Sequence, residues 1–263
     1  MSLRSLLPPF KHSPYVYSFL IGLCLFTNTN YAAPSLKICH EASNYPPYIY
    51  QEDNQSKGLL VDIIDEAAQN MKLHIEFDAK PWKRCQKDVQ TGNSHALFAM
   101  IKTPKRAKDY AFPSDPSRHL WTAKYPIFTN KNTPFVFNDY SPSKGLGAPL
   151  GYVVWQKLKD RGWLSPFQYS PEEGLKMVAM GKLDGYVVER LIGLHLLYEN
   201  QLTDSLSYSE DNLLDTIWYL PFNKSFYQSN KDLIENFWKA LNEAREQFKQ
   251  QYDKSKLAEM KPD

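Results

Sequence analysis

The sequence predicts an α/β protein with mainly parallel sheets that helices cover. Short apolar runs that suit buried strands alternate along the chain with segments in which apolar residues recur at helical spacing. A helix between two neighbouring strands returns the chain to the same edge of the sheet, so the strands pair in parallel. The chain has 263 residues, of which 14% are aromatic. This size allows one large or two small domains with substantial cores.

The first half of the chain contains three predicted strands and two predicted helices. A strand is expected at 36–39, a helix with an apolar stripe at 58–71, and a strand with alternating residues at 73–77. A second helix is expected from Trp82 to Gly92, and a buried strand at 96–100 follows it.

The middle of the chain contains fewer regular signals. A basic turn at 102–106 leads to an extended segment at 121–128, and residues 133–137 begin a second set of elements. Residues 141–149 are rich in Pro, Gly and Ser, which is typical of a surface loop.

A helix start is encoded around Ser170. Its hydroxyl can cap the helix, Pro171 occupies the first helical position, and Glu173 is placed to complete a capping box. The helix is expected to end at Gly181. The alternation then continues with a strand at 184–188, a helix at 190–199, an extended segment at 216–221 and a long amphipathic helix at 231–252.

Residues 1–33 have the layout of a secretory signal peptide. Arg4 and Lys11 precede an apolar run at 16–26, which is short for a membrane span, and two small residues follow at Ala32 and Ala33. Cleavage near these alanines would place the protein in the periplasm. An uncleaved membrane anchor is the alternative.

Charge and cysteine content limit the class of partner. The formal net charge is +2, and Arg4 and Lys11 of the leader account for both charges, so nothing favours nucleic acid as a partner. Two cysteines, Cys39 and Cys85, follow the leader; in an oxidising compartment this pair favours one disulfide over two free thiols. The histidines are scattered without metal-ligand spacing, so no metal or cofactor is expected.

Arg106 is the first candidate for a ligand contact. It follows a short buried run, and in open α/β sheets ligands bind outside the carboxyl ends of strands. A guanidinium there can hold a carboxylate with two parallel hydrogen bonds. Taken alone, Arg106 is better explained as a solvated surface charge, and only the rest of the chain favours a ligand contact.

A series of short motifs resembles one known family. In chain order they are Ile38-Cys-His-Glu, Tyr45-Pro-Pro-Tyr48, Gly58-Leu-Leu-Val-Asp62, Pro81-Trp-Lys-Arg-Cys85, Thr103-Pro-Lys-Arg106, Gly181-Lys-Leu-Asp184 with Glu189, and Trp218-Tyr-Leu-Pro-Phe-Asn-Lys224. Their order and spacing resemble the extracellular solute-binding proteins of family 3, which are periplasmic components of polar amino-acid uptake systems. The resemblance covers essentially all of the chain after the leader.

This resemblance implies a type II periplasmic-binding fold, with two α/β lobes and a ligand cleft between them. Two hinge strands would join the lobes near 127–131 and 215–218. The implied organisation is a signal peptide at 1–33, a first lobe at 34–127, a second lobe at 128–216, and a return to the first lobe with the C-terminal helix at 217–263.

The resemblance also assigns the two charged ends of a ligand. Arg106 occupies the position of the arginine that holds an α-carboxylate, and Glu189 that of the acid that pairs with the α-ammonium. The family more often has aspartate at this second position. The alternative for Glu189 is a solvated residue in the first turn of a helix, where a carboxylate interacts favourably with the helix dipole.

Five further residues complete the implied site. Tyr45, Tyr48 and Trp82 occupy positions of aromatic contacts to the ligand, and Arg84 is a candidate second basic group in the cleft. Ile101 stands where amino-acid binders usually have a threonine, so one hydrogen bond to the carboxylate is missing.

The expected function is that of a periplasmic substrate-binding protein. It would capture a small polar solute, an amino acid or a related zwitterion or organic acid, and deliver it as a monomer to an ABC-type permease in the inner membrane. Two alternatives remain. The same fold hosts a cyclohexadienyl dehydratase, in which case Glu189 would act as acid or base; or the protein senses a ligand for a separate membrane signalling protein.

Overall fold

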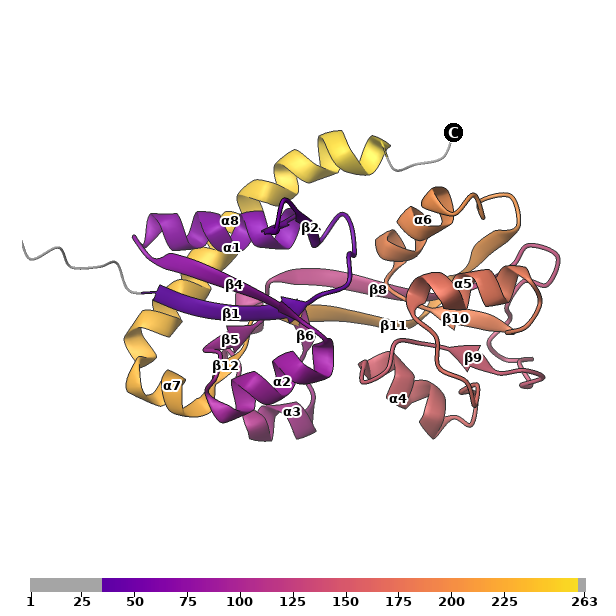
Figure 1. Cartoon of the computed structure of the whole chain (residues 1–263), viewed down its shortest axis with the longest axis horizontal. Coiled ribbons are helices and arrows are strands. Elements are labelled where there is room, and N and C mark those ends of the chain that lie inside the picture. Colours follow the sequence, from indigo (N-terminus) through magenta and orange to yellow (C-terminus); the bar gives the residue numbers. More distant parts are fainter. Residues whose placement is uncertain (1–34, 260–263) are drawn as a thin grey trace, which may run out of the picture. The chain divides into compact units, whose positions relative to one another are not determined.

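The computed structural model describes residues 35–259, with side chains to residue 249 (Figure 1). The predicted leader therefore lies outside the described residues. The α/β class is confirmed, because the described chain contains two five-stranded sheets and a small hairpin together with helices. None of the helices between residues 35 and 259 combines the length and the apolar character needed to cross a membrane.

The first sheet has the strand order β4-β1-β5-β12-β7. Its strands are β1 (Ser35–Glu41), β4 (His74–Lys80), β5 (Ala96–Leu97), β7 (Tyr110–Ala111) and β12 (Phe222–Asn223). The elements packed with it or beside it are the hairpin β2 (Tyr50–Glu52) and β3 (Gln55–Lys57), and the helices α1 (Leu59–Asn70), α2 (Trp82–Thr91), α3 (Pro104–Asp109), α7 (Lys224–Ser229) and α8 (Lys231–Glu259). Helices α1 and α8 lie side by side (Figure 1).

The second sheet has the strand order β6-β11-β8-β10-β9. Its strands are β6 (Met100–Ile101), β8 (Trp121–Asn130), β9 (Leu146–Gly147), β10 (Gly185–Val187) and β11 (Leu206–Tyr219). The remaining helices are the 3-10 turn η1 (Pro116–Arg118), α4 (Val153–Asp160), α5 (Pro171–Ala179) and α6 (Arg190–Glu199). The long strands β8 and β11 pair in antiparallel register from Asn130 opposite Leu206 to Trp121 opposite Trp218.

The strand directions are mixed, so the expectation of mainly parallel sheets is wrong. β1 pairs in parallel with β4 and β5, and β10 with β9, but β12 is antiparallel to both of its neighbours. β11 is antiparallel to β6 and β8, and β10 is antiparallel to β8. The alternation of strands and helices predicts the class correctly. It gives no direction for pairs such as β5 and β12, because the two strands are far apart in the chain.

The predicted strand at 96–100 and the predicted turn at 102–106 both differ from the structure. The apolar run is two strands, β5 in the first sheet and β6 in the second, and Ala99 turns the chain between them with φ of 61°. The basic turn is helix α3, in which Thr103 caps and Pro104 occupies the first helical turn. A hydroxyl cap followed by proline is the same start signal that predicted the helix at Ser170. At Thr103 the neighbouring lysines favoured the interpretation of a polar turn.

The region after β8 was also predicted incompletely. Residues 133–137 form neither a helix nor a strand, and the first strand of the second set is β9. The predicted surface loop at 141–149 is exposed only in its first half; residues 145–149 are buried and include β9. A Pro- and Gly-rich composition indicates irregular backbone but not its exposure.

Helix boundaries with a chemical signal were predicted well. In α5 the Ser170 hydroxyl accepts the Glu173 N–H at 3.3 Å, and the Glu173 carboxylate accepts the Ser170 N–H at 3.0 Å, so the capping box is confirmed. Helix α2 ends before Gly92, which has the left-handed conformation expected of a C-terminal glycine. Helix α6 spans the predicted residues, and α8 extends beyond the predicted end.

Candidate functional site

A small cavity lies among residues that both sheets contribute. Its volume is about 50 Å³, room for a few water molecules at roughly 10–15 Å³ each on this measure. Six of the seven residues predicted to bind a ligand line it: Tyr45, Tyr48, Trp82, Ile101, Arg106 and Glu189. The sequence prediction therefore identified residues that the fold brings together around one cavity.

Helix α3 and the preceding strand β6 hold Arg106 in place. The Thr103 hydroxyl accepts the Arg106 N–H at 3.1 Å. In the guanidinium, Nη1 donates to the Ile101 carbonyl at 3.0 Å and Nη2 donates to the Gly151 carbonyl at 3.2 Å. The guanidinium also lies over the Trp82 ring, 6.0 Å from its centroid. Burial lowers the pKa of Arg106, but a guanidinium remains charged at neutral pH.

Glu189 lies between β10 and α6, and its side chain is buried. One carboxylate oxygen accepts the N–H groups of Leu191 and Ile192 at 2.8 and 3.3 Å. The alternative role, a carboxylate at the start of a helix, is thus observed, because Glu189 caps α6. Glu189 is not solvated, however, since it is only 3% exposed. Burial raises the pKa of Glu189 to about 7, although the N–H groups of α6 favour the charged form. A buried carboxylate that titrates near neutral pH is unusual and suits a binding or catalytic site.

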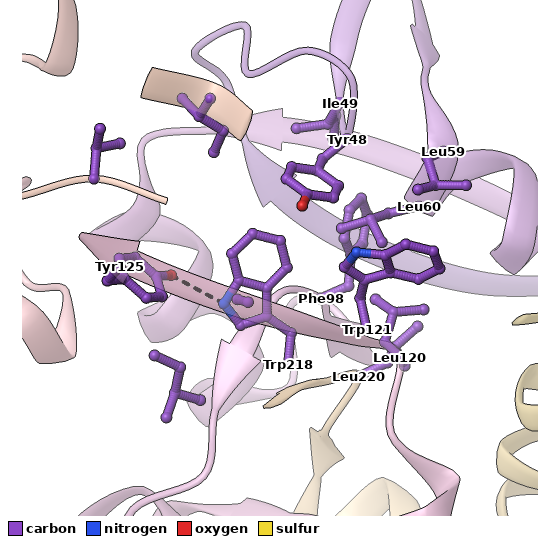
Figure 2. Close-up of a cluster of buried hydrophobic side chains, with 14 of the residues drawn as sticks. Tyr48, Ile49, Leu59, Leu60, Phe98, Leu120, Trp121, Tyr125, Trp218 and Leu220 are labelled. Carbon is purple, nitrogen blue, oxygen red and sulfur yellow. Dashed lines mark hydrogen bonds between the residues drawn. The ribbon is translucent and has the colours of Figure 1, made fainter. Parts of the chain in front are cut away.

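Aromatic side chains form much of the cavity wall. The ring centroids of Tyr48 and Trp218 are 5.0 Å apart in an edge-to-face arrangement (Figure 2). The Trp218 indole N–H donates to the Tyr125 hydroxyl at 3.0 Å. Burial, and next the Glu189 carboxylate, raise the pKa of Tyr48 well above its ordinary value. Burial also raises the pKa of Tyr125, so both tyrosines are neutral hydroxyls over the physiological pH range.

Gly58 allows helix α1 to hold the Tyr48 segment. The first N–H groups of α1 donate to this segment, Leu59 to the Pro47 carbonyl at 3.0 Å and Leu60 to the Tyr48 carbonyl at 3.1 Å. Gly58 has φ of 114°, and a Cβ there would lie 2.7 Å from the Tyr48 carbonyl oxygen. Only glycine combines this backbone angle with so close an approach.

Glu41 is the main cavity residue that the sequence reasoning missed. It is the last residue of β1, and its carboxylate accepts the N–H groups of Trp82 at 3.2 Å and Ser43 at 3.3 Å. Burial raises the pKa of Glu41. Its place at the carboxyl end of the first strand was the signal that could have identified it. Tyr125, Tyr152 and Trp218 also line the cavity and were missed, because apolar and aromatic positions in strands do not reveal which of them face a cavity.

Arg84 does not line the cavity, so its assignment to the cleft is wrong. Its side chain is 66% exposed, and its Nε lies 3.1 Å from the Asp88 carboxylate, four residues along α2. Each residue turns a helix by about 100°, so a residue two positions after Trp82 points to a different face.

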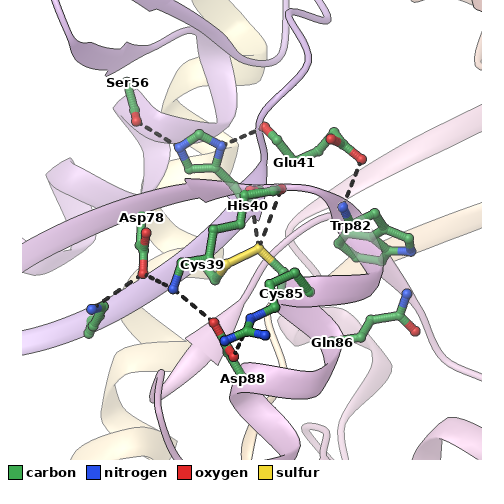
Figure 3. The surroundings of a disulfide bond; sticks show 12 residues. Cys39, His40, Glu41, Ser56, Asp78, Trp82, Cys85, Gln86 and Asp88 are labelled. Carbon is green, nitrogen blue, oxygen red and sulfur yellow. Dashed lines mark hydrogen bonds and ion pairs between the residues drawn. A yellow bond between two sulfur atoms is a disulfide. The ribbon is translucent and has the colours of Figure 1, made fainter. Parts of the chain in front are cut away.

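The disulfide between Cys39 and Cys85 is present and joins β1 to the first turn of α2 (Figure 3). Both cysteines are fully buried, with Cα atoms 5.5 Å apart. Around the disulfide lies a small apolar cluster separate from the main core, which includes Val89, Leu97 and Met100. The disulfide therefore fixes the start of α2, where Trp82 meets the Glu41 carboxylate.

The comparison with known families identifies the chain. Residues 36–256 match the bacterial extracellular solute-binding proteins, family 3. The chain belongs to this family. The resemblance inferred from the motifs is thus confirmed over nearly the whole described region.

Individual proteins are similar to the chain at low identity. The probable amino-acid-binding protein YxeM of Bacillus subtilis is 21% identical over 218 residues, which cover 81% of this chain and 78% of YxeM. A histidine kinase sensor domain with similarity to periplasmic binding proteins superposes with a TM-score of 0.69 at 20% identity, covering 82% and 92% of the two chains. The arginine-, lysine-, histidine-binding protein ArtJ of Geobacillus stearothermophilus has a TM-score of 0.68 at 17% identity, covering 87% and 100%. These structures show that the fold is that of a periplasmic binding protein.

Proposed function

We propose that this family-3 protein captures an amino acid in the cavity and releases it to a membrane partner. The observation that carries the proposal is that a partly buried guanidinium, Arg106, and a buried carboxylate, Glu189, line one small aromatic cavity. The guanidinium would hold the α-carboxylate and Glu189 the α-ammonium. Buried charges are costly unless a partner matches them, and a zwitterion matches both.

The charge balance of the cavity favours an amino acid with a cationic side chain. Two carboxylates, the partly buried Glu41 and the buried Glu189, line the cavity together with one guanidinium. A neutral zwitterion would pair with Arg106 and Glu189 and leave Glu41 without a cation. A second ammonium or guanidinium on the ligand would pair with Glu41, and the faces of Trp82 and Tyr152 would stabilise it by cation–π interaction. ArtJ, with the same fold, is named for binding arginine, lysine and histidine.

Capture would involve a closing motion of two lobes, with residues 34–127 and 217–263 as the first lobe and 128–216 as the second. The bond from Arg106 to Gly151 would then join the lobes. A cavity of about 50 Å³ has room for only a few water molecules, so a ligand as large as lysine or arginine would require the lobes to separate first. The antiparallel strands β8 and β11 would carry the chain between them.

The membrane partner would be an ABC-type permease, reached after export and removal of the leader. Delivery to a separate sensor is the second candidate, supported by the shared fold of a histidine kinase sensor domain. For a dehydratase, Glu41, Glu189 and His40 would be candidate acid-base groups, because all three line the cavity.

The test of the proposed function is a binding measurement on the chain that begins after residue 33. Native mass spectrometry of protein purified from the periplasm would show a co-purified ligand. After unfolding and refolding to remove it, calorimetry with the twenty common L-amino acids should give one site and the tightest binding for arginine or lysine. If no amino acid binds, the proposed function is wrong. Loss of labelled ligand uptake on deletion of the gene would distinguish transport from sensing.

A further inference from the structure

Trp82 contributes an unpaired polar group to the cavity. In the described chain, the buried side-chain polar atoms without a hydrogen-bond partner belong to Trp82, Ser94, His119 and Thr129. Among these four residues, Trp82 alone lines the cavity. The residue is 8% exposed, and its indole nitrogen lies on the side of the ring away from the disulfide (Figure 3).

An unpaired indole N–H in such a place suggests a function. Buried donors in native proteins are almost always paired, and one left without an acceptor costs free energy. Two other buried tryptophans illustrate this rule. The Trp218 indole N–H donates to the Tyr125 hydroxyl at 3.0 Å, and the Trp238 indole N–H donates to the Leu220 carbonyl at 2.7 Å. The Glu41 carboxylate is close to Trp82 but accepts its backbone N–H, at 3.2 Å, and not its side chain.

The surroundings of Trp82 indicate which acceptor is missing. The guanidinium of Arg106 lies 6.0 Å from the Trp82 ring centroid, and two of its N–H groups already donate to the carbonyls of Ile101 and Gly151. These bonds fix the direction of the guanidinium. An anionic group held by Arg106 would lie beside the indole, and a carboxylate can accept from both residues because it has two oxygens and several lone pairs.

We propose that the Trp82 indole N–H donates a hydrogen bond to the carboxylate of the ligand that Arg106 also holds. The inference rests on the proposed function, because it requires a carboxylate beside Arg106. It assigns to Trp82 a polar role in carboxylate recognition, in addition to its role as an aromatic wall. The disulfide and the Glu41 carboxylate then act together as a support that keeps this donor in position.

Trp82→Phe is the test, because phenylalanine keeps an aromatic ring and removes the N–H. With the amino acid that binds the parent protein most tightly as the probe, calorimetry should show roughly 10- to 100-fold weaker binding, as expected for a hydrogen bond to a charged group. The melting temperature of the ligand-free variant should fall less than that of Trp238→Phe, since Trp82→Phe loses ring volume in its apolar cluster but no hydrogen bond within the protein. Weaker binding together with this smaller loss of stability separates ligand recognition from a structural role.

Trp238→Phe is the matched control. Its indole N–H is paired within the core and does not line the cavity, so this change should lower the melting temperature and leave the affinity unchanged. A second measurement does not depend on how the variant packs. In a nitrogen-15 spectrum of the parent, the indole resonance that disappears in Trp82→Phe should shift downfield when the probe binds.

Three outcomes are decisive. Parent-like affinity in Trp82→Phe would overturn the inference while the proposed function stood. An indole resonance that stays in place at saturating probe would do the same. Failure of the parent to bind any amino acid would overturn the proposed function, and the inference with it.

Discussion

Two backbone carbonyls decide how Arg106 can act. Because Ile101 and Gly151 each accept one of its N–H groups, the guanidinium has a fixed plane before any ligand arrives. Fixed donors lose little conformational entropy on binding, and a planar guanidinium can hold a carboxylate with two parallel bonds. Ile101 thus contributes through its carbonyl, although its side chain lacks the hydroxyl that the family usually places there.

Replacement of Arg106 should affect binding far more than folding. We expect Arg106→Ala to weaken amino-acid binding by more than about a hundredfold, because removal of one partner of a buried charge pair costs on the order of 3 kcal/mol or more. Arg106→Lys should restore little, since an ammonium cannot reproduce the planar pair of bonds. Calorimetry measures both. Arg84→Ala is the matched control and should bind like the parent, because Arg84 is exposed and paired with Asp88. Equal losses in Arg84→Ala and Arg106→Ala would contradict the assignment.

Glu189 should make binding depend on pH. Its pKa in the ligand-free protein is about 7, so below pH 7 it is mostly protonated and a ligand ammonium has to displace the proton. Affinity should therefore fall by roughly tenfold for each pH unit between 7 and 5. Glu189→Gln should bind more weakly at pH 8 and lose most of this dependence, leaving only the contribution of Glu41, whose pKa burial also raises. Calorimetric titrations from pH 5 to pH 8 would show it. A flat profile in the parent would exclude Glu189 as the ammonium partner.

The same carboxyl group has the opposite effect on the ligand-free fold. Its folded-state pKa of about 7 lies above the unfolded value of 4.5, so the folded state binds the proton more tightly. The contribution of the protonated Glu189 to the free energy of unfolding is complete below pH 4.5 and is lost as the pH rises through 7. Glu189 therefore destabilises the ligand-free protein at neutral pH, and a ligand ammonium would relieve that cost.

At the scale of elements, the start of α2 joins the fold to the cavity. The disulfide connects it to β1, and the Glu41 carboxylate at the end of β1 accepts the Trp82 N–H. The junction of β1 and α2 thus positions both Glu41 and the Trp82 ring in the cavity. Any displacement of α2 should therefore change the positions of both side chains.

Loss of the disulfide should lower stability and affinity together. The cysteines are 46 residues apart, for which the chain-entropy relation gives roughly 4 kcal/mol of stabilisation. We expect the Cys39→Ala, Cys85→Ala double variant to lose about that much in urea unfolding and to bind the amino acid more weakly. Thiol titration of the denatured, unreduced parent that begins after residue 33 should find no free thiol. Two thiols per chain, or a double variant as stable as the parent, would contradict this account.

Features of the fold could be predicted from the sequence where a residue type favours one local conformation or one bond. The cap at Ser170, the glycine after α2 and the cysteine pair each specify a local conformation or a bond, and all three are confirmed. Prediction from the sequence failed where the outcome depends on distant partners. Nothing in the run at 96–100 reveals that Ala99 divides it between two sheets.

The same distinction holds for the cavity. Arg106 and Glu189 could be assigned because the motifs that contain them resemble those of the family. Glu41 also stands in such a motif, but its contact with the start of α2 joins residues 41 positions apart. Tyr125 and Trp218 meet only because β8 and β11 pair, which sequence periodicity does not specify.

At the scale of the whole molecule, the proposed motion predicts a change of size. If two lobes close on the amino acid, the radius of gyration from small-angle scattering should fall on saturation, and the melting temperature should rise by linkage. Arg106→Ala at the same amino-acid concentration is the control and should keep the radius of the ligand-free protein. An unchanged radius in the saturated parent would indicate a rigid protein and exclude lobe closure.

The most direct test of the central claim is a crystal structure of the protein with its amino acid bound. The claim is that Arg106 and Glu189 hold the two charged ends of one zwitterion in the described cavity. We expect the ligand carboxylate at about 3 Å from the Arg106 guanidinium and the ammonium at about 3 Å from the Glu189 carboxylate. A ligand bound outside this cavity, or one whose carboxylate lies away from Arg106, would contradict the account.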